Sequence, residues 1–290
     1  MNITMRIKQL LLVVAAIVAV LPASAELSYS WNPSTKTLTV SGKGHLGYNW
    51  YTEVEGVEDN KTVEVVIIGK DVEVGYQAFQ EATALRTVTF ESGYTPTTIN
   101  DQAFSDCSAL TSITLPNSIT KIGRCAFSGC TSLTAITIPH SVKTIVERAF
   151  GYCSSLNTVY LGKRVESIGI CAFENCPNIT SVTATGGTPP TCNKNIFDNA
   201  VYASATLYTY NYISDWYRYA EPWSNFTNRE SMPNYVGTKF SAVNAQGKTI
   251  WYCTQLGDDV EVVSKDYPSD YYSGYEILEG CSWTSEKKLL

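Results

Sequence analysis

The chain has 290 residues, of which 44% are hydrophobic, so it can bury a sizeable core in one or two domains. Its formal net charge of −6 and isoelectric point of about 5.1 do not favour a nucleic-acid backbone as a partner. Charged residues make up 17%, below the quarter that is usual in globular domains, so we expect a surface of Thr, Ser, Asn and Tyr.

The first 25 residues have the layout of a secretory signal peptide. Arg6 and Lys8 precede an uninterrupted apolar run over residues 10–21, and small residues follow at 23–25. The run of 12 residues is shorter than the roughly 20 that a membrane-spanning helix needs. We therefore expect a secreted or cell-surface mature chain without a transmembrane segment. The periplasm and the exterior of an outer membrane both fit this expectation.

Residues 26–62 predict a β-hairpin. Leu27, Tyr29 and Trp31 alternate with polar residues, a turn follows at residues 32–34, and residues 37–40 alternate again. The end turns of a repeat stack would otherwise expose their core, so we expect this hairpin to form an N-terminal cap.

The dipeptide Ala-Phe recurs five times, and the spacings between its Phe residues are 25, 23, 23 and 23. A Cys follows the last four of these Phe residues, three positions later. The repeated residues are Phe79, Phe104, Phe127, Phe150 and Phe173, with Cys107, Cys130, Cys153 and Cys176. A fixed period stacks identical side chains, so the pattern predicts a structural ladder of Phe and another of Cys inside a solenoid.

A short alternating stretch of β-branched residues lies in each repeat and predicts a half-buried strand. The stretches are Val88-Thr89-Phe90, Ile113-Thr114-Leu115, Ile136-Thr137-Ile138 and Val159-Tyr160-Leu161. Strands of successive turns can pair at about 4.8 Å and bury what one turn cannot. We therefore predict a solenoid of 23-residue repeats with a parallel strand ladder, which occupies residues 63–235 together with a C-terminal cap.

The C-terminal cap is predicted from an aromatic segment after the repeats. A candidate helix runs over residues 212–220, and we expect Trp216, Tyr219, Trp223 and Phe226 to pack over the last turn. Residues 236–290 have a different composition and predict a small β segment of short antiparallel strands, compatible with a truncated second module.

The stretch from Ala126 to Pro139, AFSGCTSLTAITIP, and its copies one turn away resemble the repeats of the BspA-type leucine-rich-repeat family. The resemblance covers residues 63–228 most closely. Thr209-Tyr210 stands where the family usually has Val-Pro. The resemblance implies a leucine-rich-repeat solenoid of a bacterial secreted or surface protein, with a role in adhesion to host matrix proteins or to other cells.

The sequence offers little that predicts catalysis. It has two His residues, His45 and His140, and lacks both a Gly-rich phosphate loop and a zinc-protease motif. We expect a protein that is not an enzyme and that has no cofactor, no metal and no nucleic-acid partner. His140 is expected in a solvated turn.

Nine Cys residues raise the question of a metal site. Cys125 and Cys171 each precede a ladder Cys by five positions, a spacing that also suits metal pairs. The alternative, which we favour, keeps the ladder Cys as buried small hydrophobes and turns Cys125 and Cys171 toward solvent. Cys253 and Cys281 could pair, and the sequence leaves the state of Cys192 open.

An extended solenoid surface suits binding of an extracellular protein or glycan. The outward strand positions are predicted to be Thr89, Thr114, Thr137, Tyr160 and Thr183. They form a neutral, hydroxyl-rich strip, in which Tyr160 is the expected hot spot. Cross-strand Thr pairing is the structural alternative for the strip. Trp50, Tyr51, Trp216 and Trp223 are the candidates for a glycan-binding module, and a passive structural spacer in a surface layer is the third possibility.

Overall fold

The computed structural model describes residues 26–192, 195–210, 214–232, 239–243, 249–254 and 260–264. The predicted signal peptide and Cys281 lie outside these residues. The chain divides into two compact units, residues 1–230 and 231–290, and each is considered by itself. Within the described ranges, no helix is both long enough and apolar enough to cross a membrane.

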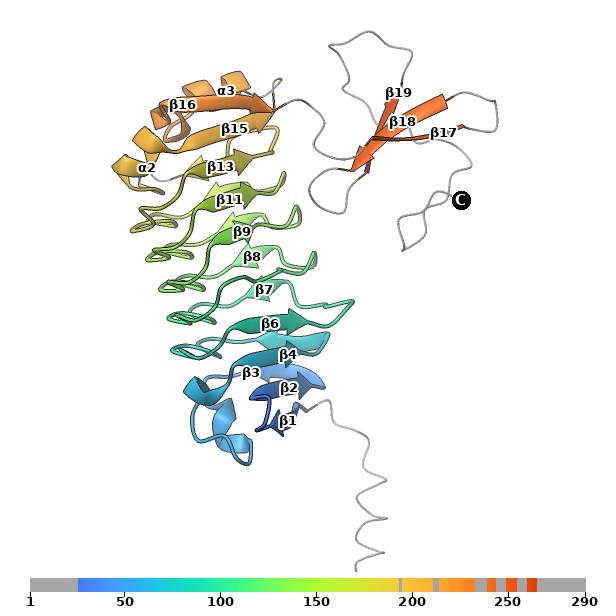
Figure 1. Cartoon of the computed structure of the whole chain (residues 1–290), viewed down its shortest axis with the longest axis vertical. Helices are drawn as coiled ribbons and strands as arrows, with labels where there is room; N and C mark the ends of the chain where they lie inside the picture. The colour runs from blue at the N-terminus through green and yellow to red at the C-terminus, as the bar shows by residue number, and fades with distance from the viewer. Residues whose placement is uncertain are drawn as a thin grey trace, which may run out of the picture. The chain divides into compact units, whose positions relative to one another are not determined.

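The described part of the first unit is a stack of short turns, and each turn adds strands to parallel ladders (Figure 1). The first ladder has two sections. One runs β1 (Ser28–Asn32), β2 (Thr37–Ser41), β4 (Val65–Ile68) and β6 (Thr87–Phe90). In it β1 pairs with β2 antiparallel, whereas β2, β4 and β6 pair in parallel. The other runs β9 (Ala135–Thr137), β11 (Thr158–Leu161), β13 (Ser181–Ala184), β15 (Thr206–Tyr210) and β16 (Asn228–Met232). The predicted leucine-rich-repeat solenoid with a parallel ladder is confirmed.

A second set of parallel strands lies at the apolar positions that follow each predicted strand, where no alternation predicts a strand. β3 (Lys43–Leu46) pairs with β5 (Asp71–Val74). A further sheet contains β7 (Thr98–Ile99), β8 (Lys121–Ile122), β10 (Thr144–Ile145), β12 (Ser167–Ile168) and β14 (Thr191–Cys192). Most of these strands have two residues, too few for an alternation that a sequence pattern can reveal.

The first ladder is interrupted at residues 112–115. The predicted strand Ile113-Thr114-Leu115 keeps its alternation, with Ile113 and Leu115 buried and Thr114 exposed. Its backbone is nevertheless not paired as a strand, so this strand prediction is wrong. The interruption follows the longest of the turns between successive Phe residues, the 25 residues from Phe79 to Phe104. The extra residues change how this turn meets the next one on the strand side.

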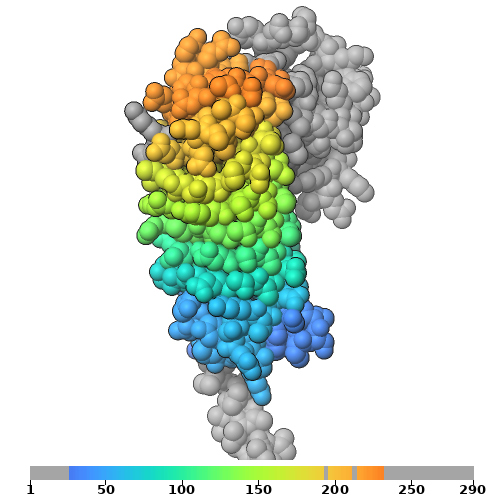
Figure 2. Space-filling view, turned by 60° about the vertical axis from the view of Figure 1, so that its left-hand side comes forward, coloured from blue at the N-terminus to red at the C-terminus, as the bar shows by residue number. Residues whose placement is uncertain are grey.

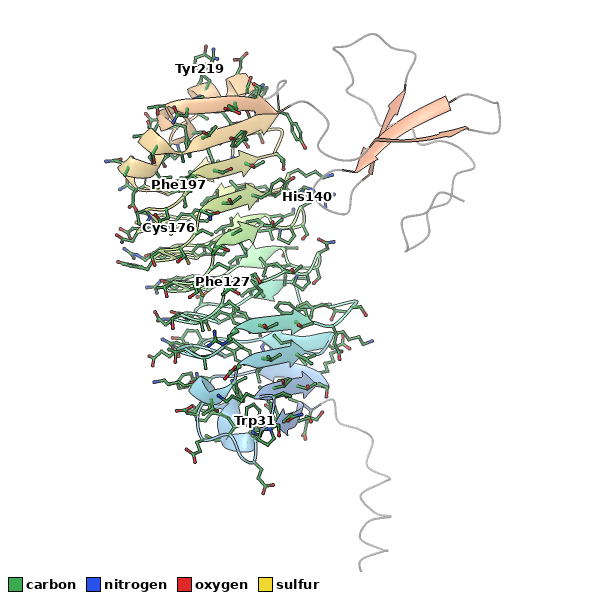
Figure 3. All side chains as sticks on the ribbon, viewed as in Figure 1. Trp31, Phe127, His140, Cys176, Phe197 and Tyr219 are labelled. Carbon is green, nitrogen blue, oxygen red and sulfur yellow. The ribbon has the colours of Figure 1, made fainter. Side chains whose placement is uncertain are left out.

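The Phe side chains form one continuous stack through the interior, of which Figure 3 labels Phe127 and Phe197. Figure 2 shows the outer surface of the stacked turns. Successive rings from Phe79 to Phe197 have centroids 5.0–5.4 Å apart and lie within 15° of parallel. Phe79 to Phe173 are fully buried. The backbone repeats with the rings: the N–H of Phe127 donates to the carbonyl oxygen of Ala149 in the next turn at 2.8 Å, and the other turns match.

The corner around each Ala-Phe contains two residues with left-handed backbone. One directly precedes the Ala, and the other lies two residues after the Phe. Ten residues occupy these positions: Gln77, Glu81, Gln102, Asp106, Cys125, Gly129, Arg148, Tyr152, Cys171 and Asn175. Nine of them are not glycine. At Gly129 a Cβ would collide with the Asp106 carboxylate, so a larger residue there would have to displace that side chain.

The ladder Cys side chains are fully buried and act as donors. The Cys130 thiol donates to the carbonyl oxygen of Phe104 at 3.2 Å, one turn back along the chain. Cys107, Cys153 and Cys176 make the same bond to Phe79, Phe127 and Phe150 at 3.1–3.2 Å. Each thiol therefore connects two turns, which a purely hydrophobic role would not require.

Aromatic side chains close both ends of the Phe stack. Trp50, in η1 (Trp50–Glu53), lies 5.6 Å from the Phe79 ring and donates its indole N–H to the carbonyl oxygen of Ala78 at 2.6 Å. η2 (Asn60–Thr62) follows in the same region. At the other end, Phe197 contacts Tyr202 and Phe226 at 5.7 Å.

The elements at this second end are α2 (Asn199–Ser204), α3 (Ser214–Tyr219) and η4 (Trp223–Asn225). Trp223 and Phe226 are buried as expected, but Trp216 and Tyr219 are exposed, and Tyr217 is the side chain of α3 that turns inward. Helical spacing explains the difference, because residues three apart share a face and Tyr217 lies off that face. Figure 3 shows Tyr219 at the end opposite Trp31.

The described residues of the second unit form an antiparallel sheet. Its strands are β17 (Lys239–Val243), β18 (Thr249–Thr254) and β19 (Val260–Ser264), with β18 in the middle.

We expect Phe127→Ala to lower the free energy of unfolding by about 3–5 kcal/mol, because it removes a fully buried ring from the middle of the stack. Tyr76→Ala, at a ring that is 58% exposed, is the matched control and should cost less than about 0.5 kcal/mol. Urea unfolding of both variants measures the difference. Similar losses for the two would contradict a stack that stabilises the fold.

The buried thiols should resist alkylation in the folded protein. With iodoacetamide at pH 8, we expect half-buried Cys125 to be labelled while Cys107, Cys130, Cys153 and Cys176 stay unlabelled. Burial raises the pKa of the Cys130 thiol to about 12, so little of the reactive thiolate forms. In denaturant all seven Cys residues from Cys107 to Cys192 should react, and peptide mass spectrometry identifies them. Protection that persists in denaturant without reductant would indicate disulfides instead.

Candidate binding surface

From β4 to β15, the outward residues of the first ladder and of the unpaired turn at residues 112–115 form a surface without charged side chains, which we call the strand face. It consists of Val65, Ile67, Thr87, Thr89, Ser112, Thr114, Ala135, Thr137, Thr158, Tyr160, Ser181, Thr183, Thr206 and Tyr208. The chain has 48 charged residues, 21 basic and 27 acidic, and none of them lies at these positions. Within each section of the ladder, strand pairing keeps the outward residues in two columns, so their spacing there follows the strand separation of about 4.8 Å.

Four of the five predicted strip residues point outward with available hydroxyl groups. Thr89, Thr114 and Thr137 are exposed, and Thr183 is half-buried. Within the described part of the chain, their hydroxyl groups have no hydrogen-bond partner. Cross-strand Thr pairing, the structural alternative, is thus not observed among these residues, and the groups can bond to water or to a partner.

Tyr160 differs from its neighbours in the strip. It occupies the same column as Thr137 and Thr183, but it is only 8% exposed. Its ring centroid lies 6.3 Å from that of His140, which accepts a hydrogen bond from the Lys163 backbone N–H at Nδ1. The expectation of an exposed hot spot at Tyr160 is therefore corrected, and half-buried His140 does not sit in open solvent.

A shallow groove of about 460 Å³ lies beside the strand face at the interrupted turn. Thr89 and Thr114 belong to both the groove and the strip, and Pro116 and Tyr94 line it further. Tyr94 is buried; its ring packs 4.8 Å from Phe90 and its hydroxyl donates to the carbonyl oxygen of Val72 at 2.8 Å. The longest turn therefore hollows the surface next to the hydroxyl strip.

Charged residues gather elsewhere and connect successive turns. Arg148 bonds Glu174 of the following turn at 3.1 Å, and Lys143 approaches Glu166 at 3.4 Å. Lys36 approaches Glu64 at 2.7 Å. These side chains are partly exposed, so each pair contributes little to stability.

The structure separates the predicted glycan-binding aromatics into buried and exposed groups. Trp50 and Trp223 are buried and Tyr51 is half-buried, which leaves Trp216 at 60% exposure. Three exposed rings were missed: Tyr48 at 45%, Tyr76 at 58% and Tyr152 at 50%. Each follows a Gly, but Tyr94 also follows a Gly and is buried, so the Gly-Tyr dipeptide alone does not predict exposure.

The Cys residues outside the ladder do not form a metal site in the described part of the chain. Cys125 is half-buried and Cys171 is buried, so the expectation that Cys171 faces solvent is wrong. The left-handed backbone at Cys171 turns its side chain toward Glu174 and Arg148. Among the described residues, no three His, Cys, Asp or Glu side chains converge as metal ligands.

The fold should lose stability at alkaline pH. Burial raises the pKa of Cys130 and of Cys192 from 9.0, and that of Tyr29 from 10.0, each to about 12. A raised folded-state pKa gives stability that is complete below the unfolded pKa and disappears as pH rises through the folded value. The urea midpoint should therefore be level to about pH 8 and fall progressively from pH 9 toward 12. A level midpoint up to pH 11.5 would contradict this burial.

Comparison with known proteins identifies the repeat. Residues 72–204 match the BspA type leucine rich repeat region in six copies, so this region of the chain is a BspA-type leucine-rich repeat. The predicted family resemblance is confirmed. Among curated proteins, none matches the chain.

Three solved structures are similar to the chain. The leucine-rich repeat protein of T. pallidum is 24% identical, with 74% of this chain and 84% of that one covered and a TM-score of 0.42. A leucine-rich repeat protein from Bacteroides ovatus is 20% identical, with 64% and 54% covered and a TM-score of 0.40. A leucine rich cell surface protein from Faecalibacterium prausnitzii is 18% identical, with 67% and 71% covered and a TM-score of 0.36.

Proposed function

We propose that this chain, with its BspA-type leucine-rich repeat region, is a non-enzymatic extracellular or cell-surface binding protein that captures a host or matrix protein on its strand face. The family supports a protein-binding or surface role. The narrower proposal, adhesion through this face, rests on the geometry of the strand face.

The uncharged strand face with available hydroxyl groups is the observation that carries the proposal. Thr89, Thr114 and Thr137 present exposed hydroxyl groups that both donate and accept, at matching positions of consecutive turns whose interior Phe rings are stacked. Dehydrating a neutral hydroxyl costs less than dehydrating a charge, so a partner can cover this face without buried ion pairs. The groove beside Thr114 supplies a depression that an otherwise regular ladder would lack.

Glycan binding is the second candidate, and one observation favours it. Trp216 and Tyr219 lie three residues apart on α3 and are 60% and 79% exposed. Rings on one helix face provide a flat apolar surface with polar edges, which suits the face of a sugar ring.

The strand-face proposal can be tested with the mature chain, residues 26–290, immobilised and exposed to collagen, fibronectin, laminin and mucin. We expect one of these proteins to bind saturably. The double variant Thr114→Arg/Thr137→Arg should weaken that binding at least about tenfold, or 1.4 kcal/mol, because two long charged side chains would occupy the neutral strip. Surface plasmon resonance measures the affinities.

Thr97→Arg is the matched control, since Thr97 is exposed and lies next to β7 on the other ladder. It should bind like the original chain. Between 0.05 and 0.5 M NaCl we expect the affinity to change little, because the face is uncharged. Equal affinity in the strand-face variant and in the control would exclude this face. Saturable polysaccharide binding that Trp216→Ala abolishes would favour the glycan candidate.

A further inference from the structure

Tyr48 and Tyr76 lie in the turns that directly follow the paired strands β3 and β5 of the second set. β3 and β5 pair in parallel with Leu46 opposite Val74, and the Gly75 N–H donates to the carbonyl oxygen of Leu46 at 3.0 Å. Tyr48 and Tyr76 each come two residues after the paired strands, at the same position of consecutive turns. Both rings are partly exposed, Tyr48 at 45% and Tyr76 at 58%, and we call these two residues the tyrosine pair.

Carboxylates flank the tyrosine pair. Glu73 lies three residues before Tyr76; its Oε2 is 3.1 Å from Nε2 of His45, and its Oε1 accepts from Asn100 at 2.9 Å. Asp101 holds the position of Tyr76 in the next turn, since its carbonyl oxygen accepts the Gln77 N–H at 3.1 Å. The Asp101 carboxylate accepts the Arg124 backbone N–H at 2.8 Å, and within the described residues it has no ion pair.

The charge of the solenoid is concentrated at this end. Residues 26–101 contain eleven acidic and five basic residues, whereas residues 102–230 contain eight acidic and nine basic residues. Four of those five basic side chains, Lys36, Lys61, Lys70 and Arg86, already contact a carboxylate. The end that carries the tyrosine pair therefore has a surplus of negative charge, which attracts cationic partners over a Debye length of about 10 Å.

We propose that the tyrosine pair is a second docking surface, and that it takes a basic, Lys- or Arg-containing segment of a polypeptide. A Lys or Arg cation stacks on an aromatic face, and each such contact at an exposed site is favourable. Asp101 and Glu73 lie where they can pair with the same cations. A neutral partner could use the rings and donate hydrogen bonds to the carboxylates, but it would lack the charge attraction that a Lys or Arg side chain adds. This surface is separate from the strand face, so the inference does not rest on the proposed function.

Fluorescence polarisation with a fluorescein-labelled hexalysine peptide tests the proposal on the mature chain. We expect Tyr48→Leu with Tyr76→Leu, which keeps apolar side chains but removes the rings, to weaken binding about fivefold to tenfold. Tyr152→Leu, at a ring that is 50% exposed elsewhere on the corner, is the matched control and should bind like the original chain.

Asp101→Asn separates the charge from the fold, because Asn keeps an oxygen that accepts the Arg124 N–H. It should weaken hexalysine binding about threefold, a loss that 0.5 M NaCl abolishes. Thr137→Ala on the strand face should leave hexalysine binding unchanged. The result for the tyrosine pair is therefore independent of whether the strand face binds a protein. The proposal would be overturned if the tyrosine replacements left hexalysine binding unchanged. It would also be overturned if the chain bound neutral cellohexaose but not hexalysine, and if the tyrosine replacements abolished that cellohexaose binding.

Discussion

Contact between identical Phe rings of consecutive turns is the constraint on which the rest of the structure depends. The turn from Phe79 to Phe104 has 25 residues, yet its rings remain 5.4 Å apart and within 9° of parallel. The strand pairing at residues 112–115, by contrast, is lost after that turn. The chain thus keeps the Phe stack where it gives up part of the ladder. Ring packing is held more strictly than strand pairing because a displaced ring leaves a cavity, while an exposed strand can bond to water.

Unfavourable backbone conformations at the corners are tolerated in exchange for contacts between turns. Nine non-glycine residues adopt left-handed backbone, a conformation that costs each of them about 1 kcal/mol. The cost is tolerated because the corner brings the Phe N–H, the Ala carbonyl and the Cys thiol into bonds between turns at once. The Cys130 thiol and the Phe104 carbonyl show the coupling: the bond exists only if the two turns keep the same register.

The sequence predicts the solenoid and its ladder because identical side chains recur at a fixed period, and a period is visible without coordinates. It does not predict the second strands, since Lys121–Ile122 or Thr144–Ile145 has too few residues to alternate. The sequence also does not predict the hydrogen bond from the Cys130 thiol to the Phe104 carbonyl. A repeated Cys has the same pattern whether its thiol donates a hydrogen bond or only fills space. Tyr160 was expected to be exposed because alternation assigns a face of the strand, and a face does not fix how much solvent reaches it.

A periodic surface offers the same features at every turn, so recognition at one place requires a departure from the period. The described part of the chain contains three such departures on outward positions: the longer turn beside Thr114, the substitution of Tyr160 for Thr, and the adjacent Tyr48 and Tyr76. None of them disturbs the Phe stack, because outward residues do not enter it. The interior therefore fixes the shape, and selection can change the surface at these positions with little effect on folding. The neutral strand face and the acidic tyrosine end can on this basis carry different binding chemistry on one scaffold.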